Sequence, residues 1–247
     1  GLDCRHPGGH HPDPGGVAGD DYPRESLWRT RPSHLGAGIL DRLSERFNAA
    51  LALAAAAHQG QIRKGTENAA GLPLPYITHP VAVAALVQRY GGAEAQILAA
   101  LLHDVLEDAG PAWAQPIRDG FGPEVLELVE FCTDGLPDAA GLKPPWRPRK
   151  EAYLAHLRAA VGPGVLVSAC DKLANLQAIL LDLTEMGEGV WDRFTGGKAG
   201  SLWYYQELVA AFAGRVPEPL AEALRRDLAS VLAVTSAGGP GHPQGEG

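Results

Sequence analysis

The clearest chemical signal in this chain of 247 residues is the segment HDVLED at residues 103–108. Neighbouring His and Asp side chains can both reach one metal ion from the edge of a helix face. Glu107 and Asp108 follow His103 and Asp104 by four residues, so on a helix they stack one turn further on. The alternative is a solvated acidic turn, although acids at the C-terminal end of a helix oppose its macrodipole. That cost favours a functional reading: two metal ligands beside two carboxylates suited to acid–base catalysis.

Two further polar positions can add to this site. His79 directly precedes Pro80 at an expected helix start, where a capping or surface role is the alternative. Asp171 follows the apolar run 165–170, and a carboxylate is costly to bury there unless it is paired or binds a metal. A salt bridge to an arginine is the alternative for Asp171. Asn175 lies one helical turn later on the same face.

Together these positions form a candidate metal-binding set of two imidazoles and two carboxylates from three separate helices. The set is His79, His103, Asp104 and Asp171. Mixed nitrogen and oxygen ligation without thiolate favours Mn²⁺, Fe²⁺ or Zn²⁺. Such an ion would polarise a phosphoryl group and lower the pKa of its bound water.

Basic residues near these motifs are suited to binding phosphate. Arg63 can make bidentate phosphate contacts or stack on a base, and Lys64 can supply a point charge. A second basic group either guides outer phosphates or forms an exposed basic loop. It consists of Lys143, Arg147, Arg149 and Lys150, of which Lys143 is the predicted substrate contact.

The elements that must position these side chains are helices. Apolar residues recur at helical spacing in eight segments, which are 39–54, 80–90, 97–105, 123–131, 153–157, 165–183, 202–212 and 220–232. Strand signals are weak, so we expect an all-α fold with one domain at residues 35–236. The Gly- and Pro-rich arms at 1–34 and 237–247 are predicted to be disordered. Two long polar loops, 64–77 and 133–149, are candidates for function.

Composition excludes several classes of protein. The formal net charge of −8 argues against a dedicated nucleic-acid binder. No apolar run approaches the roughly 18–20 residues that a membrane span needs. The three cysteines show no zinc-type spacing and no disulfide framework, which favours a reducing compartment such as the cytoplasm.

Four segments, taken in order, carry a family resemblance over about residues 50–180. They are AHQGQIRKG at 57–65, PYITHPVAVA at 75–84, AALLHDVLEDA at 99–109 and CDKLANL at 170–176. In this order they resemble the HD-domain phosphohydrolases. The branch they are most similar to comprises the hydrolase domains of RelA/SpoT proteins and the stand-alone small alarmone hydrolases.

The resemblance implies an all-helical HD domain holding one Mn²⁺. The implied metal ligands are His79, His103, Asp104 and Asp171. The implied catalytic pair is Glu107 and Asp108. The implied substrate contacts are Arg63, Lys64 and Asn175. The implied reaction is hydrolysis of the 3′-diphosphate of ppGpp or pppGpp to pyrophosphate and GDP or GTP. The expected partner is this small nucleotide, with a homo-oligomer left open.

One departure from the branch keeps the substrate open. The segment GTENAAGLPLP at 65–75 is longer than the short turn usual there, and it follows the presumed base-contacting residues. One alternative is an HD hydrolase of another phosphorylated nucleotide, such as the 2′-phosphate of NADPH. Another is a non-catalytic nucleotide-binding protein. We expect no synthetase activity, because the chain is too short for the other domains of full-length RelA/SpoT proteins.

Overall fold

A computed structural model describes residues 37–67, 70–135 and 144–236 of the chain. The predicted arms at 1–34 and 237–247 lie outside the described residues, as does Lys143. The chain divides into two units, residues 1–40 and 41–247, and the description below concerns the second.

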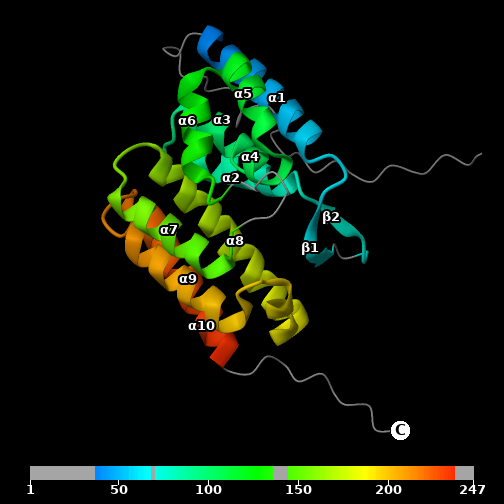
Figure 1. The fold of residues 1–247 in the computed structure, drawn as a ribbon, viewed down its shortest axis with the longest axis vertical. Coiled ribbons are helices and arrows are strands. Elements are labelled where there is room, and N and C mark those ends of the chain that lie inside the picture. Colours follow the sequence, from blue (N-terminus) through cyan, green and yellow to red (C-terminus); the bar gives the residue numbers. More distant parts are fainter. Residues whose placement is uncertain (1–36, 68–69, 136–143, 237–247) are drawn as a thin grey trace, which may run out of the picture. The chain divides into compact units, whose positions relative to one another are not determined.

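The described residues are mostly helical, which confirms the expected all-α fold (Figure 1). The α-helices are α1 (Ala37–Ala57), α2 (Thr78–Arg89), α3 (Glu94–Leu102), α4 (Val105–Ala109), α5 (Ala114–Phe121), α6 (Pro123–Cys132), α7 (Trp146–Ala159), α8 (Gly164–Met186), α9 (Gly197–Phe212) and α10 (Glu218–Ser236). Two short 3₁₀ helices, η1 (Pro111–Trp113) and η2 (Gly187–Arg193), connect some of them.

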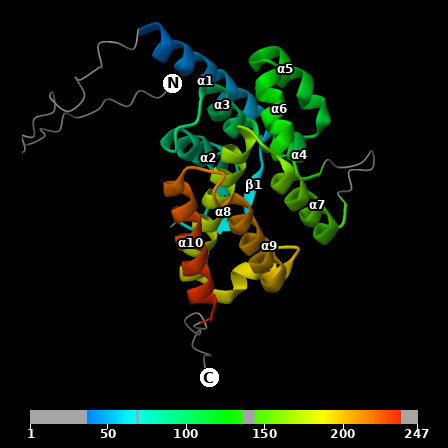
Figure 2. The ribbon, with the colours of Figure 1, turned by 90° about the vertical axis from the view of Figure 1, so that its left-hand side faces the viewer.

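Helix α8 is the centre of the fold. It packs against α2, α3 and α6 and also against α9 and α10, and it crosses the middle of the molecule in both ribbon views (Figures 1 and 2). Cys170, Leu173 and Leu176 are fully buried along it. A helix that is apolar on most sides belongs in a core, so α8 can carry polar side chains only where other groups compensate them.

The same apolarity makes the segment Gly164–Arg193 long and hydrophobic enough to cross a membrane, by length and composition alone. No other helix in the described part of the chain meets that test. However, 61% of its most apolar window is buried inside the protein. The packing of α8 in the core accounts for its composition.

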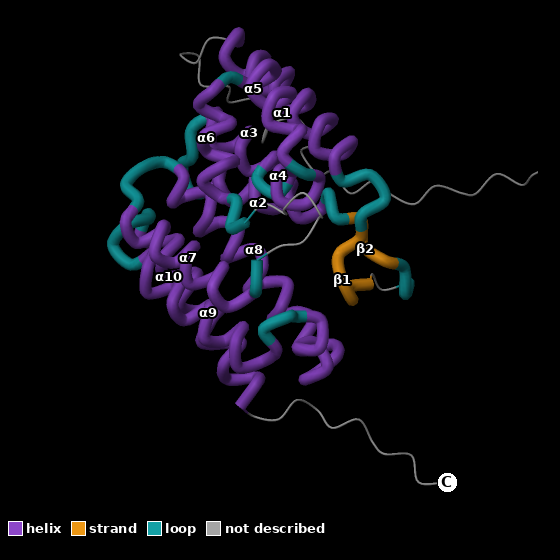
Figure 3. Tube along the Cα trace, in the orientation of Figure 1, coloured by secondary structure: helices purple, strands orange, loops and turns teal. Residues whose placement is uncertain are grey.

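A small hairpin occupies much of the first long loop that the sequence predicted. Strand β1 (Ile62–Glu67) pairs antiparallel with β2 (Pro73–Pro75), and Figure 3 shows the pair at one side of the helices. Its sequence, with adjacent charged residues and prolines, has no alternation of apolar and polar positions to announce a strand. Gly71 supplies a positive φ of 71° just before β2.

The chain also breaks where the sequence predicted one continuous helix over 97–105. Helix α3 ends at Leu102, and Val105 begins α4, so His103 and Asp104 lie in the turn between them. Glu107 and Asp108 therefore occupy the first turn of α4, not the end of a longer helix. Because α4 has only five residues, Glu107 and Asp108 lie close to both of its ends, and the helix expected over 97–105 does not extend to them.

Candidate metal centre and active site

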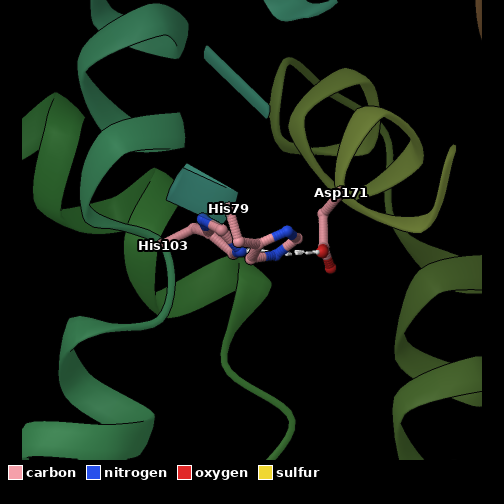
Figure 4. A group of neighbouring side chains, drawn as sticks. All are labelled: His79, His103 and Asp171. Carbon is pink, nitrogen blue, oxygen red and sulfur yellow. Dashed lines mark ion pairs between the residues drawn. The ribbon is translucent and has the colours of Figure 1, made fainter. Parts of the chain in front are cut away.

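Three side chains from separate elements converge beside α8. His79 comes from the first turn of α2, His103 from the turn after α3, and Asp171 from α8, and all three are buried. One potential ligand atom from each lies within 4.8 Å of the others. Figure 4 shows both imidazole rings directed toward the Asp171 carboxylate. The structure thus brings together three of the four predicted metal ligands in one compact group.

Asp104, the fourth predicted ligand, lies at the edge of this group. Its Oδ2 is 3.0 Å from Nε2 of His103 and 3.7 Å from Nε2 of His79. Tyr76 donates a hydrogen bond of 2.5 Å from its hydroxyl to the same Oδ2 atom. Asp104 is therefore within reach of a shared ion, and Tyr76 fixes where its carboxylate points.

The hydrogen bonds around His103 indicate that the group is built for a cation. Its Nδ1 lies 2.8 Å from the carbonyl oxygen of Ala100, so Nδ1 carries the proton and donates it. In the neutral ring, the Nε2 lone pair then faces Oδ2 of Asp104 and, at 3.6 Å, Oδ1 of Asp171. Among the described residues, Nε2 has no hydrogen-bond partner. Electron-rich atoms that face one another in a buried space are complementary to a divalent ion.

The spacing of these atoms also fits a metal. Nε2 of His79 lies 3.1 Å from Oδ1 of Asp171, and the other short separations run from 3.0 to 3.7 Å. Ligands that each stand about 2.0–2.2 Å from a Zn²⁺-sized ion lie roughly 3 Å from their neighbours. The donor set contains only imidazole and carboxylate, which suits Mn²⁺, Fe²⁺ or Zn²⁺.

Electrostatics in the group favour charge despite the burial. Burial opposes a charged His103, but Asp104 and Asp171 outweigh it and raise the pKa of this imidazole well above its usual value. Burial likewise opposes ionisation of Asp171, yet Lys172 and then the two imidazoles hold the pKa of this carboxyl well below its usual value. In the chain without metal, a proton on His103 thus supplies the positive charge that a bound metal cation would otherwise supply.

His79, Asp104 and Asp171 also line a pocket of about 350 Å³. The residues that line it are Ile62, Arg63, Lys64, Tyr76, His79, Asp104, Glu107, Cys132, Asp134, Lys150, Asp171, Lys172, Asn175, Ala178, Ile179, Asp182, Arg193, Phe194 and Tyr205. One face of α8 forms a wall, on which Asp171, Asn175, Ile179 and Asp182 follow one another at helical spacing. At 1.5 Å per residue this wall extends about 16 Å along the helix axis.

The predicted catalytic pair is divided between two environments. Glu107 lines the pocket, and its Oε1 is 3.6 Å from Nη1 of Arg149. Asp108 is exposed and is not among the lining residues, and its Oδ2 accepts a hydrogen bond of 2.8 Å from Gln61. Of the two carboxylates, only Glu107 can meet a molecule inside the pocket directly.

The predicted substrate contacts lie along the same pocket. Arg63 and Lys64, on β1, both line it, and so does Asn175 on α8. Nη2 of Arg63 donates a hydrogen bond of 3.3 Å to Oδ1 of Asn175, so the hairpin and α8 meet there. Lys143 lies outside the described residues, and its predicted role stays a prediction.

The described members of the second basic group, Arg147, Arg149 and Lys150, lie in different surroundings. Lys150 lines the pocket, and Arg149 and Lys150 both form ion pairs with the Asp134 carboxylate. Burial lowers the pKa of Lys150, and Asp134 partly opposes that change. Arg147 instead covers the ring of Trp203, 3.3 Å from its centroid, and pairs with Glu151 on the surface.

Sequence reasoning assigned no role to several pocket residues. Lys172 donates a hydrogen bond of 2.5 Å to Oδ2 of Asp171, on the side away from the imidazoles. Tyr76 and Asp134 each hold a charged neighbour in place. Lys172 was detectable in principle, because a lysine in the apolar helix predicted at 165–183 is costly to bury without a counter-charge. The contacts of Tyr76 and Asp134 span distant segments that local patterns do not connect.

Comparison with known proteins identifies the family. Residues 50–195, more than half of the chain, match the HD domain. This chain belongs to the HD domain family. The matched span contains every candidate metal ligand, which confirms the resemblance drawn from the four ordered motifs. HD domains bind divalent metal ions, and the group formed by His79, His103 and Asp171 is the candidate site in this one.

Named relatives of this HD domain act on ppGpp. The bifunctional (p)ppGpp synthase/hydrolase SpoT of Escherichia coli K12 is 36% identical over 141 residues, covering 55% of this chain and 18% of that protein. The guanosine-3′,5′-bis(diphosphate) 3′-pyrophosphohydrolase MESH1 of Xenopus tropicalis is 35% identical over 128 residues, covering 50% of this chain and 64% of that protein. The chain thus spans less than a fifth of the long bacterial relatives it matches.

A solved structure extends the similarity to three dimensions. It is a metazoan orthologue of SpoT described as hydrolysing ppGpp, with 25% sequence identity and a TM-score of 0.58. The match covers 74% of this chain and 94% of that one. This HD domain therefore shares its helical fold with a protein described as hydrolysing ppGpp.

Proposed function

We propose that this HD domain hydrolyses the 3′-diphosphate of ppGpp and pppGpp. Water attacks the phosphorus bonded to the 3′ oxygen, the bond from that phosphorus to the 3′ oxygen breaks, and pyrophosphate and GDP or GTP are released. One observation carries the proposal: a single pocket is lined by His79, Asp104 and Asp171 and by the basic side chains of Arg63 and Lys64, and His103 adjoins these potential metal ligands. Relatives that are 35–36% identical to this chain over 128–141 residues are named as hydrolases of ppGpp.

The proposed cofactor is one Mn²⁺ ion, held by His79, His103, Asp104 and Asp171. When bound, it would polarise the phosphoryl group and lower the pKa of water at the site. Lys172 stays on Oδ2 of Asp171, leaving Oδ1 directed toward the imidazoles. Tyr76 orients Asp104 in the same way through its hydroxyl. Such outer contacts fix the direction of a ligand and are part of the site.

Glu107 is the proposed general base. It lines the pocket from the first turn of α4 and can accept a proton from the attacking water. Nη1 of Arg149 lies 3.6 Å from its Oε1 and forms an ion pair with it. Asp108 supports this assignment indirectly, because its hydrogen bond with Gln61 fixes the same short helix.

The remaining pocket residues are assigned to the nucleotide. Arg63 and Lys64 contact phosphate or base, Asn175 contacts the sugar or base between the two ends, and Lys150 offers a further positive charge. We keep Lys143 as a proposed contact with the outer phosphates. The cytoplasm is the proposed location, which the free and buried state of Cys132 and Cys170 supports.

Release of pyrophosphate from ppGpp by the purified chain with added Mn²⁺ tests the proposal. The Asp104→Ala variant is the control, and the wild type should exceed it by orders of magnitude. A panel under the same conditions includes pppGpp and NADPH. Release no greater than in the control would contradict the reaction, and a higher kcat/KM for NADPH than for ppGpp would reassign the substrate. Intact ppGpp that stays bound for hours would indicate a binding protein instead.

A further inference from the structure

One arginine at the end of η2 connects three separate segments around the pocket. Nη2 of Arg193 lies 2.6 Å from Oδ2 of Asp182 on α8. Its Nε donates a hydrogen bond of 3.2 Å to the carbonyl oxygen of Val190, within η2. Its Nη1 donates another of 3.2 Å to the carbonyl oxygen of Lys64, on β1 and 129 residues earlier in the chain.

The ion pair with Asp182 is shielded from water, whereas the hydrogen bond to Lys64 lies at an exposed position. The side chain of Arg193 is 12% exposed and that of Asp182 is 6% exposed, and both line the pocket. Shielding strengthens a charge-assisted hydrogen bond and makes the loss of either partner costly. The donors of the guanidinium stand on three separate nitrogen atoms, and all three are used here, whereas the donors of a lysine ammonium share one nitrogen and cannot reach partners this far apart.

The hairpin that Arg193 contacts needs such a connection. A two-stranded hairpin is marginally stable by itself in water. Side chains on this hairpin are partly in solvent, for Ile62 is 53% exposed and Leu72 is 60% exposed. The hydrogen bond to Lys64 falls in the middle of β1, beside Arg63, whose side chain meets Asn175 across the pocket.

We propose that Arg193 is a positioning residue that fastens strand β1 to α8 and η2, and so holds Arg63 and Lys64 where they meet the nucleotide. This inference rests on the proposed function for its effect on substrate. The fastening itself is a property of the apo chain. Asp182 serves as the anchor, since its ion pair fixes the guanidinium that reaches β1.

The Arg193→Lys variant separates positioning from simple stability. It keeps a positive charge for Asp182 but loses the hydrogen bond to the Lys64 carbonyl. We expect KM for ppGpp to rise about tenfold, which matches the loss of one charge-assisted hydrogen bond of ~1.4 kcal/mol. We expect kcat to change less than about twofold and the Kd for Mn²⁺ to stay the same, because no metal-binding residue is touched. Amide hydrogen exchange at residues 62–67 should accelerate about tenfold.

Arg215→Lys is the matched control. Arg215 is also partly buried and also bridges segments through carbonyl oxygens, those of Leu157, Ala160 and Ala211, but it does not line the pocket. The Arg215→Lys variant should lower the stability of the fold without changing KM for ppGpp or the amide hydrogen exchange of residues 62–67. Equal changes in both variants would mean general destabilisation and would overturn the proposal.

The exchange experiment also distinguishes the two proposals from each other. If the wild type hydrolyses ppGpp while Arg193→Lys alters neither KM nor exchange at 62–67, the fastening role is wrong and the proposed function stands. If the wild type does not act on ppGpp, the proposed function fails. Faster exchange at 62–67 in Arg193→Lys alone would then still support the fastening role, and unchanged exchange would overturn it.

Discussion

At the scale of single residues, the two adjacent carboxylates of α4 differ in whether they line the pocket. Glu107 lines the pocket, whereas Asp108 is exposed and bonded to Gln61. Glu107→Gln should therefore lower kcat by about 10²- to 10⁴-fold, the usual contribution of a positioned general base. The Mn²⁺ content of the purified variant should equal that of the wild type. Steady-state kinetics and elemental analysis together check both statements.

Asp108→Asn is the isosteric comparison for that variant. Its amide keeps an acceptor for Gln61, so we expect kcat within about tenfold of the wild type. If both substitutions reduced kcat equally, the two carboxylates would act as a unit, and the assignment of Glu107 alone would be wrong.

The proposed metal ligands yield a second prediction at this scale. Asp171→Ala removes a central oxygen of the buried group and leaves Lys172 without its counter-charge, so metal should be lost. Tyr76→Phe removes only the hydrogen bond to Asp104 and should weaken Mn²⁺ binding by about 10- to 100-fold, as loss of an outer contact does. Competition with a fluorescent chelator measures both affinities. Wild-type affinity in Asp171→Ala would refute its place among the ligands.

Much of this site could be predicted from the sequence. His103 and Asp104 are adjacent, and the burial cost of Asp171 in an apolar helix singled it out. The structure brings these side chains together with His79, as predicted. The supporting contacts could not be foreseen in the same way, because Tyr76 and Arg193 act on residues 28 and 129 positions away. Such pairs are set by packing, which local spacing does not encode.

At the scale of elements, helices were predictable and their interruptions were not. Apolar periodicity identified α8 and α10, since each buries one or more faces over five turns or so. The break between α3 and α4 left no signal, because His103 and Asp104 keep nearly helical backbone angles. The hairpin was missed because pairing within a loop, not an apolar face, forms β1 and β2.

The start of α8 supplies a prediction about packing. A Cβ added at Gly164 would lie 2.5 Å from ring atoms of Phe131 on α6. Gly164→Ala should therefore destabilise the fold by about 1–3 kcal/mol through overpacking. Each kcal/mol lowers Tm by about 2–4 °C in a domain of this size, so calorimetry can resolve the change.

Gly120→Ala is the control for that substitution. A Cβ at Gly120, in α5, would meet nothing within 4 Å, and alanine favours a helix over glycine. Its Tm should stay equal or rise slightly. A similar loss in both variants would mean that the contact with Phe131 is not what limits Gly164.

At the scale of the whole molecule, the net charge of −8 and a polyanionic substrate are compatible only through local fields. The pocket is lined by five cationic side chains, Arg63 and Lys64 among them, and by five carboxylates, so phosphate would meet net positive charge there only once a divalent ion is bound. The remaining acidic surface repels nucleotides and slows their approach, an effect that salt screens over about 8–10 Å. Specific attraction therefore depends on the pocket and its metal, not on the overall charge.

The proposed metal site also connects distant parts of the molecule. His79 belongs to α2, His103 and Asp104 to the turn before α4, and Asp171 to the central helix α8. An ion that binds only the folded arrangement stabilises it by mass action, by about 2.7 kcal/mol at a free concentration of 100 Kd. Adding Mn²⁺ to that level should raise Tm by about 5–11 °C, and a chelator should reverse the shift.

The Asp171→Ala variant separates this effect from general ion binding. It should show no Mn²⁺-dependent shift, because the group that joins α2 to α8 has lost its carboxylate. Mg²⁺ should raise Tm less than Mn²⁺ in the wild type, since two imidazole nitrogens suit a softer ion than Mg²⁺. An equal rise in Tm with Mn²⁺ in wild type and variant would place the stabilising ion elsewhere and remove the metal from the junction of these helices.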